Sequence, residues 1–237
     1  MRYVKSLAVA VIALVIGAFS AGPAFGTPDQ IALVAPWGNT AYNSSGPLVT
    51  VTYTISATNA IPLSAVHGVQ AGIDHWNNCL FAGSDSFNET LGSDSFSTTD
   101  TGCSTLSFKG DWHFVLASAG TTPMVKISIR KGGGNIAGQT FFKFDSSGFL
   151  DGARVQISGK AFGVPNTAQE VWNVAAHELG HVVGMGHSDV STDLMFPVIN
   201  GNVAFESCEI SGAEALYGSW LPSAGSPALP SSSTANC

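Results

Sequence analysis

The sequence predicts an α+β fold, in which two helices pack on a twisted open sheet. Short segments that alternate apolar and polar residues recur along the chain, and one segment with helical spacing interrupts them early. A second helical segment follows the last of these strands and has a capping signal at its start. At 237 residues, the chain is long enough for one well-buried domain and short for two.

The first half of the chain predicts one strand, one helix and a loop. Residues 47–56 alternate Val49, Val51 and Tyr53 with threonines, which is typical of a half-buried strand. Residues 64–78 carry apolar side chains at every third or fourth position, so we expect an amphipathic helix. The Ser-, Asp- and Gly-rich stretch after it contains GSDSF twice, and we expect a solvated loop there.

Four further strands and a helix are predicted in the second half. The strands are expected at 112–116, 124–130, 140–144 and 153–158, with glycine-rich turns between them. Thr167 and Glu170 have the spacing of a capping box, and the helix that they begin should end near Val183, where Gly184 can adopt the left-handed conformation. Residues 219–237 lack periodicity, so we expect a linker or frayed end anchored by Cys237.

The N-terminal 26 residues predict export. Arg2 and Lys5 precede an unbroken apolar run, and small residues at positions 24 and 26 fit a signal-peptide cleavage site. An uncleaved anchor is the alternative, although the run is shorter than a bilayer span requires. We therefore expect a secreted protein with one folded domain at 27–218 and a tail at 219–237.

An exported chain can form disulfides, and this one has four cysteines. Three connectivities are open. We favour Cys79–Cys103 and Cys208–Cys237, because each pairing closes a local loop.

Charge narrows the range of partners. Charged residues make up 11% of the chain, with nine basic residues against 16 acidic ones. The stretches 27–108 and 161–237 contain no basic residue. The sequence therefore offers no basic face for a nucleic acid. We expect a monomer with no membrane contact beyond the signal segment.

One segment carries the chemistry. It reads HELGHVVGMGH and begins at His177. On a helix, residues four apart share a face, so His177 and His181 can bind one zinc ion. Gly184 lets the chain turn, and His187 returns as a third ligand. Three protein ligands leave a coordination position open, as in catalytic zinc sites. Glu178 then lies beside the metal, where a general base can take a proton from water.

This segment, followed by Ser188 and by Leu194-Met195-Phe196-Pro197, resembles the metzincin superfamily of zinc endopeptidases, and within it the matrixin branch. Met195 stands eight residues after the third histidine, as the Met-turn methionine does in matrixins. Looser similarity extends to three other segments: 138–140, 174–176 and a closing helix at 210–218.

The resemblance implies a zincin-like fold, with a mostly parallel sheet and a small C-terminal subdomain. It implies an endopeptidase that hydrolyses peptide bonds of proteins with zinc-activated water and Glu178 as the general base. An extended substrate would pair with an edge strand near 135–142. Pro197, Val198 and Ile199 would line the primary specificity pocket.

The chain departs from matrixins in several respects. It has no PRCGxPD-type cysteine-switch motif, and Ile199 stands where matrixins commonly carry Tyr. We interpret His67, His75 and His113 as packing or surface residues, so a second, structural zinc is not expected.

Calcium is compatible with the sequence at two places. Asp145, Asp151 or loop carbonyls could bind it, as could Asp85 and Asp94 of the GSDSF repeats, although their spacing matches no known calcium repeat.

Two other functions remain open from the sequence. One is a secreted zinc-containing binding or adhesion module with little or no turnover; Glu178 argues against it, because a purely zinc-holding site has no use for that carboxylate. The other is a metal-dependent hydrolase of non-peptide amides, against which the matrixin-like segment argues.

Overall fold

The computed structural model describes residues 29–237 except 39, 44–47, 59, 132–135, 159–166 and 224. The predicted signal segment and most of the glycine-rich turn after residue 131 lie outside the described residues. Within the described part, no helix is both long and apolar enough to cross a membrane.

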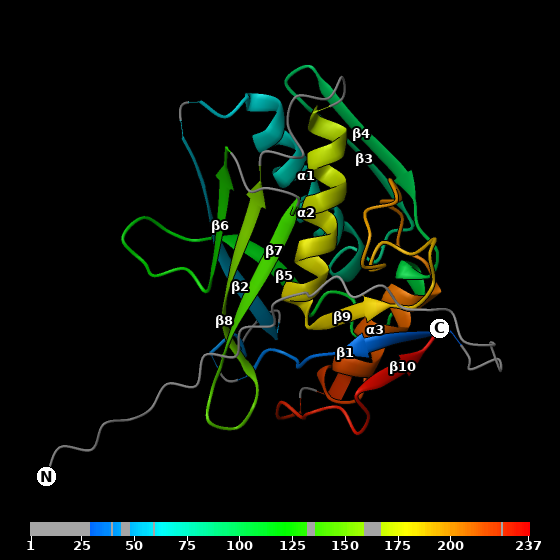
Figure 1. The fold of residues 1–237 in the computed structure, drawn as a ribbon. Helices are drawn as coiled ribbons and strands as arrows, with labels where there is room; N and C mark the ends of the chain where they lie inside the picture. The colour runs from blue at the N-terminus through cyan, green and yellow to red at the C-terminus, as the bar shows by residue number, and fades with distance from the viewer. Residues whose placement is uncertain are drawn as a thin grey trace, which may run out of the picture.

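A five-stranded sheet forms one layer of the molecule (Figure 1). Its order is β5-β2-β6-β8-β7, with four parallel strands and an antiparallel edge strand, β7. The predicted strands are confirmed, with small shifts at their ends. Their bounds are Val49–Ala57 (β2), Trp112–Leu116 (β5), Val125–Arg130 (β6), Gly138–Phe144 (β7) and Leu150–Ser158 (β8).

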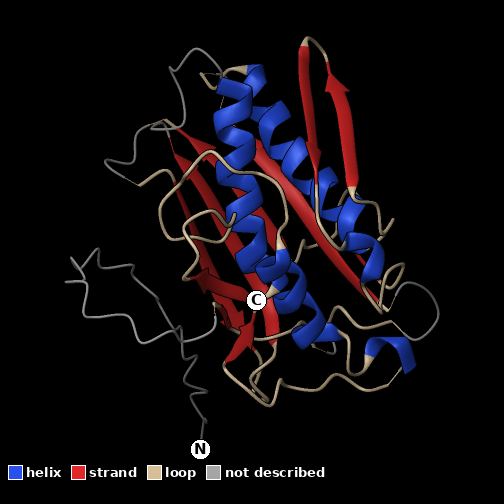
Figure 2. Ribbon diagram, turned by 90° about the vertical axis from the view of Figure 1, so that its right-hand side faces the viewer, coloured by secondary structure: helices blue, strands red, loops and turns tan. Residues whose placement is uncertain are grey.

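Two long helices cover one face of this sheet (Figure 2). They are α1 (Leu63–Leu80) and α2 (Thr167–Val183), and both were predicted. Trp76 of α1 donates its indole N–H to the carbonyl of Ala176 at 2.8 Å, which ties the two helices together beside the histidine motif. The core between helices and sheet is therefore the platform on which α2 presents its motif.

The expected loop after α1 is instead a β-hairpin, so that prediction was wrong. The strands β3 (Ser86–Leu91) and β4 (Asp94–Thr99) each begin within one GSDSF repeat, and they pair antiparallel around Gly92, whose φ is +61°. Phe87 and Phe96 are 4% and 2% exposed and lie against Trp172 of α2. The repeats alternate a buried Phe with polar residues, and burial of these two rings fixes the hairpin.

The C-terminal tail is also more ordered than expected. A three-stranded sheet has the order β10-β1-β9, and its strands are Thr234–Asn236, Gln30–Leu33 and Met185–Ser188. Both predicted disulfides, Cys79–Cys103 and Cys208–Cys237, are confirmed. The second joins the last residue to α3 (Ser207–Tyr217), the closing helix, so the tail ends in a paired and cross-linked strand rather than a frayed end.

Candidate active site

Helix α2 ends at the site. Aromatic side chains from distant segments of the chain hydrogen-bond the free carbonyl groups at its C-terminus. The last carbonyls of a helix lack intrahelical partners. Here Trp37 donates its indole N–H to the carbonyl of Val182 at 2.7 Å, and the Tyr217 hydroxyl donates to that of Val183 at 2.6 Å. Gly184 then has a φ of +115°, the left-handed conformation predicted for it. The chain turns there into β9, which carries His187.

The three predicted histidines converge. Ligand atoms of His177, His181 and His187 lie within 4.8 Å of one another, and their ring centroids are 4.9 to 5.5 Å apart. Backbone carbonyls orient two of the rings: Nδ1 of His177 lies 2.7 Å from the Leu194 oxygen, and Nδ1 of His181 lies 2.9 Å from the Met185 oxygen. An Nδ1 that donates to a carbonyl leaves Nε2 as a lone-pair donor for a metal.

Burial keeps these imidazoles neutral. It lowers the pKa of His177 to about 4, although the bond to the Leu194 carbonyl opposes the shift. Burial also lowers the pKa of His181 well below its usual value, and that of His187 to a smaller extent. Neutral imidazole is the form that binds a metal, so the donor set fits a zinc ion with three nitrogen ligands.

Glu178 is held next to this cluster by the edge strand β7. Thr140 donates its hydroxyl to Glu178 Oε2 at 2.6 Å and also lies 3.1 Å from the Glu178 carbonyl oxygen. Burial raises the pKa of Glu178 to about 7, and the Thr140 hydrogen bond lowers it in part. A carboxyl group with that pKa can exchange protons near neutral pH.

Gly138 lets β7 approach α2 this closely. A Cβ at this position would lie 2.5 Å from Glu178 Oε1 and 2.8 Å from Val174 Cγ1. Contacts that short do not occur for real Cβ atoms, so a larger residue would displace either the edge strand or the Glu178 carboxylate from this arrangement.

Met195 is fully buried, and its side chain lies against Gly180 of α2, the residue before His181. Its backbone is fixed on both sides. Ser188 N–H, from the residue after the third histidine, donates to the Met195 carbonyl at 2.9 Å, and Met195 N–H donates to Glu209 Oε1 at 2.9 Å. This loop therefore holds the Leu194 carbonyl that orients His177.

Glu209, which holds the Met195 backbone, is a residue that the sequence analysis did not single out. It is fully buried, and its second oxygen accepts from Glu206 N–H at 3.0 Å in a capping box at the start of α3. The signal that could have found it is the pair of glutamates three residues apart before a helix. Thr140 appeared only as part of a looser similarity, because nothing in a strand sequence shows which residue will face a helix motif.

The predicted pocket residues follow the Met195 loop. Pro197, Val198 and Ile199 are exposed, with Val198 at 65% and Ile199 at 36%. Exposed apolar side chains there are compatible with a wall that a substrate side chain would cover.

The other three histidines lie apart from the site. His75 is buried and bonds Asp100 at 2.9 Å, His67 bonds Asp94 at 2.7 Å, and His113 packs edge-to-face on Phe81. Among the residues that the structure describes, the other potential ligand cluster contains Asp193 and the two sulfurs of a disulfide, which are not free to bind a metal.

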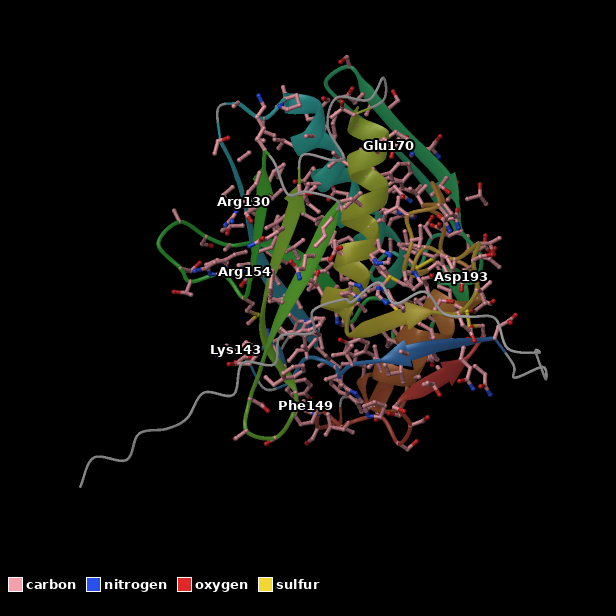
Figure 3. The ribbon with its side chains drawn as sticks, viewed as in Figure 1. Arg130, Lys143, Phe149, Arg154, Glu170 and Asp193 are labelled. Carbon is pink, nitrogen blue, oxygen red and sulfur yellow. A yellow bond between two sulfur atoms is a disulfide. The ribbon has the colours of Figure 1, made fainter. Side chains whose placement is uncertain are left out.

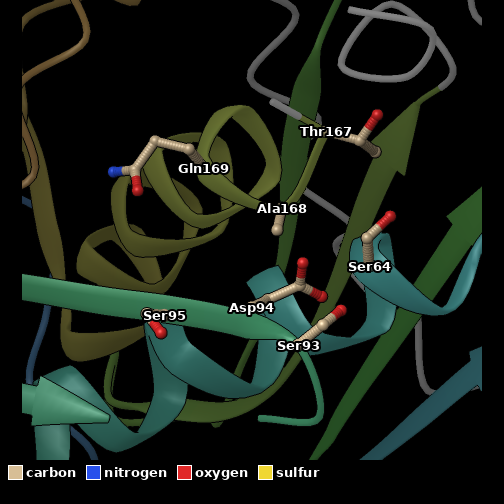
Figure 4. Close-up of a pocket in the computed structure, with 7 residues that line it drawn as sticks. All are labelled: Ser64, Ser93, Asp94, Ser95, Thr167, Ala168 and Gln169. Carbon is tan, nitrogen blue, oxygen red and sulfur yellow. The ribbon is translucent and has the colours of Figure 1, made fainter. Parts of the chain in front are cut away.

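The acidic residues considered for calcium are engaged separately. Asp85 accepts from Ser104, Asp145 Oδ1 accepts from two backbone N–H groups of its own turn, and Lys143 binds Asp151. Asp94, which His67 also contacts, lines a polar hollow of about 470 Å³ between the hairpin and the N-terminal ends of α1 and α2 (Figure 4). None of His177, His181 and His187 lines this hollow. Of its seven lining residues, Asp94 is the charged one.

The family model and the individual relatives of this chain point to the same protein family. The sequence model of the matrixin family matches residues 71–218. Metalloendoproteinase 5-MMP of Arabidopsis thaliana is 42% identical over 55 residues, which are 22% of this chain and 15% of that protein. Karilysin of Tannerella forsythia is 35% identical over 69 residues, 29% of this chain and 12% of that protein. Matrix metalloproteinase-19 of Homo sapiens is 42% identical over 52 residues, 21% of this chain and 10% of that protein. The matched part thus spans 15% or less of these relatives.

Proposed function

Because this chain belongs to the matrixin family, we propose that it is a secreted zinc-dependent endopeptidase that hydrolyses peptide bonds of proteins. The observation that carries the proposal is the convergence of three neutral imidazoles beside a buried carboxyl group. Three protein ligands with a fourth position left open are the arrangement of catalytic zinc sites.

The residues that would hold zinc are His177, His181 and His187. Zinc supplies Lewis-acid chemistry: it polarises a carbonyl oxygen and makes water more acidic. The protein supplies the orientation, through the carbonyls of Leu194 and Met185, and the dry surroundings that strengthen electrostatic interactions.

Glu178 is the proposed general base. Its Oε2 already carries a hydrogen bond from Thr140, so the acceptor that remains for a water proton is Oε1. The same carboxyl group would later give this proton to the leaving amine, since a group with a pKa near the working pH can both accept and donate.

An extended peptide would pair with β7. This strand is the edge of the five-stranded sheet and lies against α2, so its outer row of backbone groups can bind a peptide main chain next to the histidines. Pro197, Val198 and Ile199 would line the primary specificity pocket, which receives one substrate side chain.

The test is cleavage of a denatured protein by the purified chain, beside Glu178→Gln, Glu170→Gln and a chelator. Glu170 lies exposed on the first turn of the same helix, so it controls for loss of a glutamate from α2 (Figure 3). We expect Glu178→Gln to keep stoichiometric zinc and lose about 10²–10⁴-fold in kcat. Glu170→Gln should match the unmodified protein.

Full activity in Glu178→Gln would refute the general-base assignment. A folded, zinc-loaded chain that cleaves no member of a broad peptide library would favour the binding module instead.

A further inference from the structure

The few basic side chains of this acidic protein gather on one side of the five-stranded sheet. We call this side the outer sheet face; it is the side turned away from α1 and α2 (Figure 2). In β6, Val125, Ile127 and Ile129 are buried toward the helices, so the alternating Lys126 and Arg130 face outward and are exposed.

The adjacent strands extend this positive surface. In β8, Val155 and Ile157 are buried and Arg154 is exposed, and in β7 Lys143 is exposed between buried Phe142 and the strand end. Figure 3 shows Arg130, Arg154 and Lys143 along the side of the sheet away from the helices. The sequence has nine basic residues, and these strands hold four of them.

These cations are close together and little neutralised. Lys126 and Arg154 are direct partners in the β6–β8 register, so their side chains stand next to each other. The one carboxylate within β6, β7 and β8 is Asp151, which Lys143 binds. The protein has a net charge of −7, so this positive surface is opposite in sign to the protein as a whole. The sequence analysis expected no basic face, because the sheet brings together cations that lie far apart in the sequence.

Hydrogen-bonding groups surround the cations. Ser128 and Gln156 are register partners between Lys126 and Arg130, and both are partly exposed. Gln139 of β7 pairs with Gln156. The face therefore presents positive charge together with hydroxyl and amide groups over three adjacent strands.

We propose that the outer sheet face binds an acidic polysaccharide. Such a polymer offers anionic groups to Lys126, Arg130 and Arg154, and hydroxyls to the Ser and Gln side chains between them. This site goes beyond the proposed peptidase function and does not depend on zinc.

Other anionic partners fit this face less well. A lipid surface is usually held by Trp, Phe or Leu side chains that insert between headgroups, and β6 and β8 present none outward. Single-stranded nucleic acid needs open aromatic rings for stacking, whereas the Phe141 ring is covered by the Arg154 guanidinium 4.3 Å from its centroid. A protein partner usually covers an apolar centre, whereas the outward side chains of β6 and β8 are Lys, Arg, Ser and Gln.

Such binding would hold the enzyme on a polyanionic matrix while its active site stays free, since the histidines lie on the opposite, helix-covered side of the sheet. Hydrolysis of a small peptide should therefore be unaffected by a bound polysaccharide.

The test measures binding of two probes to the full chain: heparin, which is sulfated, and polygalacturonate, which is carboxylated. The chain carries Glu178→Gln so that it does not cleave itself during the measurement. The site variant is Lys126→Gln with Arg130→Gln and Arg154→Gln. A charge-matched control, Asn88→Asp with Ser95→Asp and Ser231→Asp, gives the same change in net charge at exposed positions elsewhere. Vesicles of phosphatidylserine and phosphatidylcholine are a second ligand.

We expect salt-sensitive binding to at least one polysaccharide, about 10-fold or more weaker in the site variant and unchanged in the control. Introduced into the active enzyme, the three site substitutions should leave peptide hydrolysis as it was. Equal loss in both variants would mean that net charge, not this face, governs binding, and would overturn the proposal. So would binding to neither polysaccharide at low salt, or binding to the vesicles alone.

Discussion

At the residue scale, one hydroxyl group decides how the proposed base is held. Thr140 comes from β7 and Glu178 from α2, and their hydrogen bond is a tertiary contact on which the carboxylate orientation depends. A base must be kept within a fraction of an ångström of its productive position. We therefore expect Thr140, which supports the base, to affect turnover without affecting metal binding.

We expect Thr140→Val to lower kcat by about 10-fold or more, because the isosteric side chain leaves Glu178 Oε2 without its donor. Zinc content should not change, since the Thr140 hydroxyl bonds Glu178 and not one of the three histidines. Thr140→Ser restores the hydroxyl and should recover most of the activity. Steady-state kinetics with metal analysis checks this, and equal activity of the Val and Ser variants would contradict it.

Glu209 predicts a pH dependence of stability in the metal-free protein. Burial raises its pKa from 4.5 to about 7, against the opposing effect of the backbone donors Met195 and Glu206. Between those two pH values the folded protein binds a proton that the unfolded chain releases. The free energy of unfolding therefore falls as pH rises through this window and levels off above about 7.

In Glu209→Gln this group no longer titrates. The unfolding free energies of the unmodified protein and of Glu209→Gln differ by a constant amount that the substitution itself introduces. In addition, this difference should change by up to about 3 kcal/mol between pH 4.5 and 7. Urea titrations across this range, in the presence of a chelator, measure it. A difference independent of pH would show that folding does not raise the pKa of Glu209.

At the element scale, alternation and helical spacing predicted the five strands of the large sheet and both long helices. Each of these elements has enough residues for its period to be visible, as in β6 with three buried and three outward positions. The β3–β4 hairpin was missed because its outward positions are Ser, Asn and Thr, and its single buried aromatic per strand gives no visible period. The hairpin forms because Phe87 and Phe96 are buried against Trp172 of α2. This is a tertiary contact, and the local sequence does not reveal it.

We expect the β3–β4 hairpin to be stabilised mainly by burial of the Phe87 and Phe96 rings. Phe96 is 2% exposed and packs on Trp172 at 5.5 Å, so Phe96→Ala is expected to lower the free energy of unfolding by about 3–5 kcal/mol. Phe81 is 43% exposed, and Phe81→Ala, the same change in chemistry, should cost about 1 kcal/mol or less. Denaturant unfolding of the two variants compares them, and similar losses would argue that the hairpin does not use Phe96 as a core residue.

At the scale of the whole molecule, the two ends of the described chain meet beside the third histidine. Strand β1 pairs with β9, the strand that carries His187, through Ile31 with Ser188 and Leu33 with Met185. On its other side β1 pairs with β10. No sequence period could predict this sheet, since its strands have three or four residues and join segments from opposite ends of the chain.

This arrangement makes the Cys208–Cys237 disulfide a support for the proposed metal site. It holds β10 against α3, β10 flanks β1, and β1 flanks β9, while Cys237 N–H also donates to the Asp29 carbonyl at 2.8 Å. Loss of the disulfide should loosen β9 and misplace His187. Loss of a group that orients a metal ligand directly lowers metal affinity by about 10–100-fold, and we expect misplacement of His187 to have an effect in the same range.

The second disulfide provides a matched control. The cysteines of the two pairs are 24 and 29 residues apart, so the chain-entropy contributions of the two disulfides to stability are nearly equal. We expect Cys208→Ala with Cys237→Ala, and Cys79→Ala with Cys103→Ala, to lower Tm by similar amounts. Zinc affinity, measured by competition with a chromophoric chelator below both melting temperatures, should fall about 10–100-fold in the first variant alone. Equal zinc affinities in the two variants would mean that the C-terminal strand stabilises the fold without positioning His187.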